Sequence, residues 1–305
     1  MTGPMIELQH FRKTYGDKIA VEDVSFEVQQ GEIFGLLGPN GAGKTSILET
    51  LEGLRESNGG QTLVTGLDPM DDARKLRNVI GVQLQSAGMP ESITPHEAMK
   101  FFCAYHEVEP RFDLLTRLGL AEKNHTQFYE LSTGQQRRLA LALAVAHNPR
   151  VVFMDEPTAG LDVASRVELH NLMRDLKGNG TTIMLATHDM AEAEGMSDRV
   201  AILLNGKLAA MGTPLQITAT GKGLTKISVQ TQAGCLENTV SSFPAVQQQR
   251  KKENYTIYFS TDISATVSAI LSFIMEQHDS VIDLRVERPS LEDRFLEITN
   301  TGKIQ

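Results

Sequence analysis

Residues 38–46 combine glycine, lysine and hydroxyl side chains in a spacing that suits phosphate binding. The segment reads Gly-Pro-Asn-Gly-Ala-Gly-Lys-Thr-Ser and matches the pattern G-x-x-x-x-G-K-S/T at every specified position. Glycines let successive backbone N–H groups converge on an anion, and the start of a following helix adds positive potential. Lys44 in such a loop reaches the outer phosphates, and the Thr45 hydroxyl suits Mg²⁺, which prefers oxygen ligands. The pattern therefore predicts ATP or GTP binding rather than a glycine-rich turn with an incidental lysine.

Every residue of this loop is a candidate for nucleotide binding. The set is Gly38, Pro39, Asn40, Gly41, Ala42, Gly43, Lys44, Thr45 and Ser46. The flanking sequence fits the pattern, because residues 32–37 predict a short apolar strand and residues 45–51 predict the first turns of a helix. Upstream, residues 5–28 alternate apolar and polar in two runs that predict an antiparallel hairpin. Tyr15 lies in its turn, either as an ordinary turn residue or as an aromatic ring that stacks on adenine.

Polar side chains also end three of the strands predicted farther along the chain. Gln85 ends one strand, Asp155 and Glu156 end the apolar run Val-Val-Phe-Met, and His188 ends another strand. Ligands of open α/β sheets lie at the carboxyl ends of the strands, so we expect these side chains to gather there. Asp155 suits metal binding, and Glu156 suits water positioning or general-base work. Taken singly, each residue is also compatible with an ordinary strand end.

A helical pattern replaces the strands between residues 86 and 148. Helices are expected at residues 95–106, 111–120 and 133–147, which together read as an inserted helical subdomain. Ser132 is placed as the N-cap of the third helix. Capping alone would explain this serine, but a helix start of this kind is also an anion site if it meets another chain's nucleotide.

The last third of the chain predicts a second, smaller domain. After a hairpin at residues 199–211 and a short helix from Pro214, the pattern reads strand, helix, strand, strand, helix, strand. These elements are expected at residues 226–231, 236–243, 246–250, 255–260, 263–277 and 281–287, followed by a tail helix at residues 290–298. Their order is the ferredoxin-like α+β arrangement.

Composition limits the classes of protein to which the chain can belong. Its 305 residues, 41% of them hydrophobic, can fill one large core and a smaller one. A formal net charge of −9 argues against a nucleic-acid partner held mainly through its phosphates. Two cysteines, Cys103 and Cys235, and scattered histidines predict a reducing cytosol and no structural metal. We expect neither a secretory signal nor a membrane span, so membrane work would need a partner chain.

Taken together, these motifs resemble the ATP-binding subunit of an ABC transporter over residues 6–213. Residues 38–45 match the Walker A motif, residues 131–135 (Leu-Ser-Thr-Gly-Gln) match the LSGGQ signature, and residues 151–155 match Walker B. Glu156, which follows directly, corresponds to the catalytic glutamate of the family. The remaining family positions are Tyr15 for adenine stacking, Gln85 of the glutamine loop, Asp162 after Walker B and the switch histidine His188.

One position of the signature departs from the family. Thr133 stands where glycine is common, and it adds a β-branched side chain beside the expected γ-phosphate site. Ser132, Gly134 and Gln135, whose groups should do the binding, are intact. We therefore expect activity to survive.

The resemblance implies a fold and a domain organisation. The fold would be an α/β P-loop NTPase of ABC type, with a mixed sheet core, an antiparallel β subdomain and the helical subdomain at about residues 86–148. This ATP-binding domain would span residues 1–220. Residues 221–305 would form the ferredoxin-like domain, either as an accessory domain that stabilises a dimer or as a ligand sensor.

The resemblance also implies a composite site in a head-to-tail homodimer. Two ATP molecules would each lie between the Walker A loop of one subunit and the signature of the other. The signature groups are those of Ser132, Gly134 and Gln135. Mg²⁺ would be bound by Thr45, Gln85 and, mostly through water, Asp155.

Catalysis would fall to a small set of side chains, namely Glu156, His188, Lys44 and Gln85. Glu156 would polarise the attacking water and His188 would contact the γ-phosphate. Asp162 would couple the two nucleotide sites. Phosphoryl transfer needs mainly positioning and charge neutralisation, so these polar groups are those that the chemistry requires.

The end of the chain resembles one branch of the family. Residues 288–296 (Arg-Pro-Ser-Leu-Glu-Asp-Arg-Phe-Leu) are similar to the ending of ATPases that serve multidrug, antibiotic-resistance and lipid or polysaccharide exporters. Such ATPases generally work with a separately encoded transmembrane permease, which implies a peripheral location at the cytoplasmic face of the membrane. The expected docking site is the helical stretch at residues 85–147. The alternative is a soluble ABC ATPase acting on ribosomes or nucleic-acid complexes, which the acidic charge, the single nucleotide domain and the lack of a long coiled-coil pattern disfavour.

Overall fold

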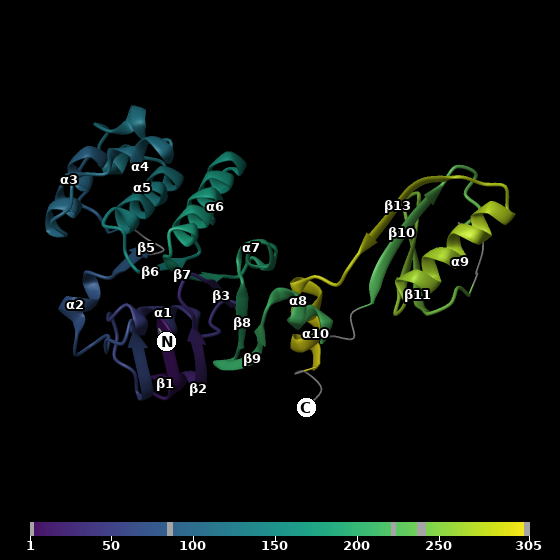
Figure 1. The fold of residues 1–305 in the computed structure, drawn as a ribbon, viewed down its shortest axis with the longest axis horizontal. Coiled ribbons are helices and arrows are strands. Elements are labelled where there is room, and N and C mark those ends of the chain that lie inside the picture. Colours follow the sequence, from purple (N-terminus) through teal and green to yellow (C-terminus); the bar gives the residue numbers. More distant parts are fainter. Residues whose placement is uncertain (1–2, 84–87, 221–223, 237–241, 302–305) are drawn as a thin grey trace. The chain divides into compact units, whose positions relative to one another are not determined.

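The computed structural model describes residues 3–83, 88–220, 224–236 and 242–301, and the chain divides into two compact units. The first unit spans Met1–Pro214 and the second spans Leu215–Gln305. The division lies a few residues before the expected boundary at residue 220. Figure 1 shows the elements of both units.

A six-stranded sheet forms the centre of the first unit (Figure 1). Its strands are β3 (Ile33–Leu37), β5 (Ile80–Gln83), β6 (Val151–Asp155), β7 (Thr182–Thr187), β8 (Arg199–Leu204) and β9 (Lys207–Gly212). They lie in the order β5-β6-β7-β3-β8-β9, with β9 antiparallel to β8 and the other neighbours parallel. Every residue of β3, β6 and β7 is buried, because successive side chains enter apolar cores on opposite faces. The expected mixed sheet is therefore confirmed.

An antiparallel sheet of three strands covers one face. It consists of β1 (Ile6–Tyr15), β2 (Lys18–Val28) and β4 (Gly59–Val64) in the order β2-β1-β4. The expected hairpin is confirmed, since β1 and β2 pair up to the turn that follows Tyr15. Helix α1 (Lys44–Leu51) shares one apolar core with these strands and with alternate residues of β3 and β6.

The other core joins the helices to the central sheet. α3 (Pro95–Tyr105), α4 (Phe112–Arg117), α5 (Thr133–Val145) and α6 (Val163–Gly178) pack there with β6 and β7. α4 ends earlier than expected because Gly119 adopts a left-handed conformation with φ of +67°, which terminates the helix. Two short helices, α2 (Ala73–Arg77) and α7 (Met190–Met196), were not anticipated from the sequence pattern.

The second unit contains an antiparallel sheet of four strands. These are β10 (Thr225–Thr231), β11 (Val246–Lys252), β12 (Tyr255–Ser260) and β13 (Val281–Glu287), in the order β11-β12-β10-β13. α9 (Ile263–Glu276) joins β12 to β13 and buries Ile270 and Ile274 against Tyr258 and its neighbours. This strand order, with α9 between β12 and β13, is that of the predicted ferredoxin-like arrangement. The helix expected at residues 236–243 falls largely on residues 237–241, which lie outside the described part of the chain.

Two further helices belong to the end of the chain and to the start of the second unit. They are α8 (Pro214–Ala219) and α10 (Leu291–Thr301). Across the described residues, none of the helices combines the length and the apolar character needed to cross a bilayer.

The packing of β5 against α5 leads to a stability prediction. A Cβ atom added to Gly81 would lie 2.0 Å from the carbonyl oxygen of Ala144. We expect Gly81→Ala to lower the free energy of unfolding by about 1–3 kcal/mol, because backbone atoms of two packed elements would have to separate. Urea unfolding followed by circular dichroism measures this change.

The matched control is Gly178→Ala at the end of α6, where no atom lies within 4 Å of the added Cβ. Helix propensity predicts an unchanged or slightly increased stability for that variant. Equal unfolding midpoints for the two variants would contradict the tight contact between β5 and α5.

Candidate active site

The glycine loop leaves β3 and closes at the start of α1. A Cβ atom on Gly38 would lie 2.5 Å from the carbonyl oxygen of Leu203, and one on Gly43 would lie 2.8 Å from that of Ala20. Gly43 also has a φ of +106°, which L side chains rarely adopt. Gly43 caps α1 without a side-chain hydrogen bond, so the first N–H groups of the helix remain available to an anion.

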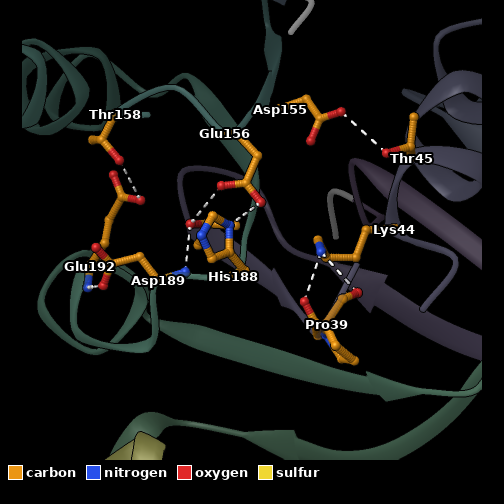
Figure 2. A network of polar contacts seen from close by, with 11 residues as sticks. Pro39, Lys44, Thr45, Asp155, Glu156, Thr158, His188, Asp189 and Glu192 are labelled. Atoms are coloured by element: carbon orange, nitrogen blue, oxygen red, sulfur yellow. Dashed lines mark hydrogen bonds and ion pairs between the residues drawn. The ribbon is translucent and has the colours of Figure 1, made fainter. Parts of the chain in front are cut away.

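Lys44 holds its ammonium group within this loop (Figure 2). Its Nζ donates to the carbonyl oxygens of Gly38 at 2.7 Å and Pro39 at 3.4 Å. Burial lowers the pKa of Lys44, and the negative charges of Glu156 and Asp155 oppose that shift. A buried cation that rests on neutral carbonyls is well suited to receive phosphate oxygens, which form stronger, charge-assisted hydrogen bonds.

Asp155 and Thr45 bring two oxygen ligands together. The Thr45 hydroxyl donates to Asp155 Oδ2 at 3.3 Å (Figure 2). Burial, and then the charge of Glu156, raises the pKa of the Asp155 carboxyl. A carboxylate that is destabilised in this way gains from a nearby cation, and a hydroxyl with a carboxylate suits Mg²⁺. These two side chains therefore fit a Mg²⁺ ion.

Glu156 turns away from the strand that precedes it. Its φ of +49° places it in the left-handed region, while its N–H still donates to Ala186 of β7 at 2.9 Å. Glu156 Oε1 lies 2.8 Å from His188 Nδ1, and the Thr187 hydroxyl lies 3.5 Å from Oε2 (Figure 2). The structure thus brings the predicted acid and the predicted histidine into direct contact.

A cavity of about 210 Å³ lies beside these groups. It is lined by Tyr15, Lys18, Ala20, Asn40, Gly41, Gly43, Lys44, Thr45, Ser46, Asp155 and Glu156. Gly38, Pro39 and Ala42 shape the loop behind it, where the Ala42 N–H donates to the Pro39 carbonyl at 3.1 Å. A polar cavity bounded by a glycine loop, a buried lysine and two carboxylates can hold a phosphorylated ligand and its cation.

Tyr15 stands at the edge of this cavity, as its position upstream of the loop predicts. Its hydroxyl lies 3.2 Å from Ser46 Oγ, which joins the turn of the first hairpin to α1. The cationic groups of Lys13 and Arg55 lie 5.2 and 5.5 Å from the ring centroid. Tyr15 is 40% exposed, so part of its side chain can meet a nucleobase.

The signature residues begin α5 and are not among those that line the cavity. Ser132 Oγ accepts the N–H of Gln135 at 3.3 Å, and Gln135 Oε1 accepts the N–H of Ser132 at 2.9 Å. This reciprocal capping leaves both Ser132 and Thr133 exposed. Thr133 takes no part in the cap, so the departure from glycine leaves the start of the helix intact.

Asp162 caps α6 in a similar exposed position. Its carboxylate accepts the N–H of Ser165 at 2.8 Å and the Ser165 hydroxyl at 3.0 Å, and these bonds lower the pKa of Asp162. The two helix starts are neighbours, since a Cβ on Gly134 would lie 3.6 Å from Leu161 Cδ2. Within one chain, therefore, the structure groups Asp162 with the signature and not with the glycine loop. Gln85 lies outside the described residues.

Two buried acids near the site were not anticipated from the sequence pattern. Glu192 accepts a hydrogen bond from the Thr158 hydroxyl at 3.0 Å and lies 3.3 Å from His170 Nε2, which ties the loop after Glu156 to α7 (Figure 2). Its only sequence signal is the spacing Asp189-x-x-Glu192, a helix-capping pattern that does not reveal burial. Glu52 follows α1, and burial, aided by the charge of Asp155, raises its pKa to about 8.

Comparison with known proteins places this geometry in a family. Residues 21–159 match the family model described as ABC transporter. The chain is 30% identical over 306 residues to the linearmycin resistance ATP-binding protein of Bacillus subtilis (strain 168), across 97% of this chain and 98% of that protein. It is 33% identical over 293 residues to a fluoroquinolones export ATP-binding protein of Mycobacterium tuberculosis (strain CDC 1551 / Oshkosh), across 95% of this chain and 90% of that protein.

A solved structure extends the comparison to a nucleotide-bound state. It is the dimeric structure of an ATP-binding cassette in a post-hydrolysis state, bound to ADP and Pi. The likeness has a TM-score of 0.63 at 25% identity and covers 68% of this chain and 98% of that one. The fold expected from the motifs is confirmed by this likeness.

The raised pKa of Glu52 predicts a pH dependence of stability. The folded chain keeps a proton on Glu52 up to about pH 8, whereas an unfolded chain releases it near the ordinary pKa of 4.5. The contribution of Glu52 to the free energy of unfolding is therefore fully present below pH 4.5 and is lost as the pH rises through about 8. We expect Glu52→Gln, which stays neutral, to gain stability over the parent chain across that window, by about 2–5 kcal/mol at its upper end.

Urea unfolding at a series of pH values tests this expectation. The control is Glu122→Gln, which changes an exposed glutamate in the same way and should follow the parent chain at every pH. If the free energies of unfolding of Glu52→Gln and the parent chain differed by a constant amount between pH 5 and 8, Glu52 would already be ionised in the folded chain over that range.

Proposed function

Since this chain belongs to the ABC transporter family of ATP-binding proteins, we propose that two copies of it hydrolyse ATP to drive export through a separate membrane permease. The observation that carries the proposal is the contact of Glu156 with His188 beside a cavity that also contains Lys44. An acid, a cation and a glycine loop around one cavity are the parts that phosphoryl transfer requires. The ATPase would act at the cytoplasmic face of the membrane, held there by the permease.

Phosphate binding falls to the loop and to Lys44. The N–H groups at the start of α1 have no capping side chain, and the Lys44 ammonium exchanges loop carbonyls for phosphate oxygens. The helix N–H groups and the Lys44 ammonium would both gain a charged hydrogen-bond partner in a site that is largely shielded from water. This gain favours binding of the phosphate anion. Tyr15 and Ser46 would bound the site on the side of the nucleobase.

Mg²⁺ would be held by Thr45 and Asp155, whose oxygens already face each other at 3.3 Å. Gln85 is the third proposed ligand. When bound, the ion neutralises charge on the phosphate oxygens. Asp155 would also become more acidic beside a cation, which reverses the effect of its burial.

Glu156 would orient the attacking water and accept its proton. Its Oε1 is held by His188, while Oε2 has a longer contact of 3.5 Å with the Thr187 hydroxyl. One carboxylate oxygen is therefore fixed and the other is more loosely engaged, as a general base requires. His188 has a side chain that is 60% exposed, so it can also reach a phosphate group.

A second copy of the chain would complete the site. Ser132, Gly134, Gln135 and Asp162 do not line the cavity of their own chain, yet they present two helix starts at an exposed surface. Helix starts bind anions, so the start of α5 at Ser132, Gly134 and Gln135 is suited to the phosphates of a partner's nucleotide. The Asp162 carboxylate is itself an anion, and its proposed role is to couple the two nucleotide sites. The dimeric ADP-bound and Pi-bound relative supports this arrangement.

Export rests on the named relatives and on an exposed aromatic surface of the helical subdomain. The two relatives are a linearmycin resistance protein and a fluoroquinolones export protein, and both match along nearly the whole chain. On α3, Phe101 and Tyr105 lie one helical turn apart and are 66% and 58% exposed. Exposed aromatic side chains of this kind favour contact with another protein, and we propose the cytoplasmic loops of the permease.

Glu156→Gln tests the chemistry. The variant keeps the shape of the side chain but cannot accept a proton, so we expect ATP affinity to remain within about threefold while the hydrolysis rate falls by about 10²–10⁴-fold. Because ATP then stays bound, the dimer should also accumulate. Phosphate release, equilibrium nucleotide binding and sedimentation velocity measure the three effects.

The matched control is Glu276→Gln, an exposed glutamate at the end of α9, which should leave hydrolysis unchanged. Lys44→Ala should lose nucleotide binding itself. Full hydrolysis by Glu156→Gln, or a monomer with ATP bound, would contradict the proposed roles.

Affinity purification from membranes tests the partner. A tagged chain, expressed in its native host and extracted gently, should retain a membrane protein with several spans that mass spectrometry identifies. We expect Phe101→Asp with Tyr105→Asp to reduce that recovery at least about tenfold, because burying new charges opposes docking. Val167→Asp, at an exposed position within α6, serves as the control.

Recovery of ribosomal or nucleic-acid-associated proteins in place of a membrane protein would favour the soluble ATPase. Equal recovery by the aromatic variant and by the control would move the docking site away from α3. ATP hydrolysis by the aromatic variant, without its partner, confirms that the nucleotide site remains folded.

A further inference from the structure

The sheet of the second unit has two outer edges with different chemistry. β11 forms one edge and β13 the other (Figure 1). β11 carries three successive cations, Arg250, Lys251 and Lys252, and charged residues are a common means of preventing a further strand from adding to an edge. β13 instead exposes Val281, Ile282 and Val286, at 38%, 56% and 41%. Within the described residues, β10 is its only strand partner.

The residues of β13 are complementary to themselves when the strand is reversed. It reads Val-Ile-Asp-Leu-Arg-Val-Glu, with Leu284 at the centre. An antiparallel copy centred on Leu284 places Asp283 opposite Arg285, twice by symmetry, and places Leu284 opposite itself. In the same register Ile282 lies opposite Val286. Directly opposite residues share one face of a sheet, so each of these pairs is in contact.

The two charges that this register requires are already on one face of the sheet. Arg285 Nε donates to Asp283 Oδ2 at 2.7 Å, and the Tyr255 hydroxyl donates to the same oxygen at 2.7 Å. β13 follows β10 in regular register from Asp283 to Glu287, with one irregularity before that segment. From Asp283 to Glu287, β13 is therefore paired without a bulge, and Asp283 and Arg285 lie on one face of it.

Helix α9 adds exposed apolar surface to the second unit. Phe273 packs against Phe243 at 5.7 Å between centroids, and Phe243 packs against Tyr258 of β12 at 5.3 Å. Leu271 and Met275 are each two positions from Phe273, so they project from another side of the helix. They are 37% and 74% exposed.

We propose that β13 of a second copy of this chain pairs with β13 in antiparallel fashion, about a two-fold axis at Leu284. The two sheets then form one continuous sheet with both α9 helices on the same face. Backbone hydrogen bonds supply the attachment, and the cross-pairs of Asp283 with Arg285 fix the register. This contact goes beyond the proposed ATPase cycle, because it needs neither nucleotide nor Mg²⁺.

A charge-reversal experiment on the full chain tests the register. Sedimentation velocity without nucleotide at micromolar concentration should show a dimer for the parent chain. Arg285→Asp places four acids at the axis and Asp283→Arg places four bases there, so each variant alone should sediment as a monomer. An equimolar mixture should restore the dimer, because every cross-strand pair is then of opposite charge.

An edge-blocking pair of variants tests the location. Val286→Lys should shift the chain to a monomer, whereas Gln249→Lys on the opposite edge should leave the dimer intact. Circular dichroism and ATP binding check that each variant is folded. A monomeric parent chain without nucleotide, a dimer that survives Val286→Lys, or a mixture that stays monomeric would each overturn the proposal.

The sedimentation results for the β13 variants can be told apart from those that test ATP hydrolysis. Failure of β13 pairing leaves the ATP-dependent dimer of Glu156→Gln unchanged, since that dimer depends on the glycine loop and the signature. Loss of hydrolysis in turn leaves pairing without nucleotide unchanged. A different protein bound at β13, found in place of a second copy, would also count against the proposal.

Discussion

Burial of charge at the end of the central sheet is the constraint on which the first unit depends. Lys44, Asp155 and Glu156 are each less than a tenth exposed, and a buried charge is costly unless it has a partner. The three partners lie on different elements. Lys44 donates to the loop carbonyls, Asp155 accepts from the Thr45 hydroxyl of α1, and Glu156 contacts His188 after β7. The wholly buried strands β3, β6 and β7 hold these elements together. The site is therefore positioned by strands that are buried along their whole length.

The two units carry surfaces of different kinds for association with a second copy. The first unit presents the start of α5 at Ser132, which is suited to an anionic ligand shared between chains. The second presents the backbone edge of β13, which is suited to another strand. If both proposals hold, one contact follows the nucleotide cycle and the other persists through it. The second unit would then keep the partner nearby and raise its effective concentration between cycles.

The sequence predicted the parts of the site that lie at fixed positions within motifs. The glycine loop, the Asp155-Glu156 pair at the end of an apolar strand, and the histidine after the next parallel strand all follow from local pattern and sheet topology. Glu52 and Glu192 could not be found in this way, because their burial depends on packing between elements far apart in the chain. The early end of α4 differs from these cases, because Gly119 is a visible sequence signal for a helix end, and the apolar periodicity that continues past it led to the longer expected helix.

The glycine loop approaches the backbones of β8 and β2 closely, and this has a genetic consequence. Any side chain at Gly38 would press on the Leu203 carbonyl, and any at Gly43 would press on the Ala20 carbonyl. Every missense change in either codon adds a Cβ atom, whatever amino acid results. Neither codon therefore offers a missense change that avoids this clash.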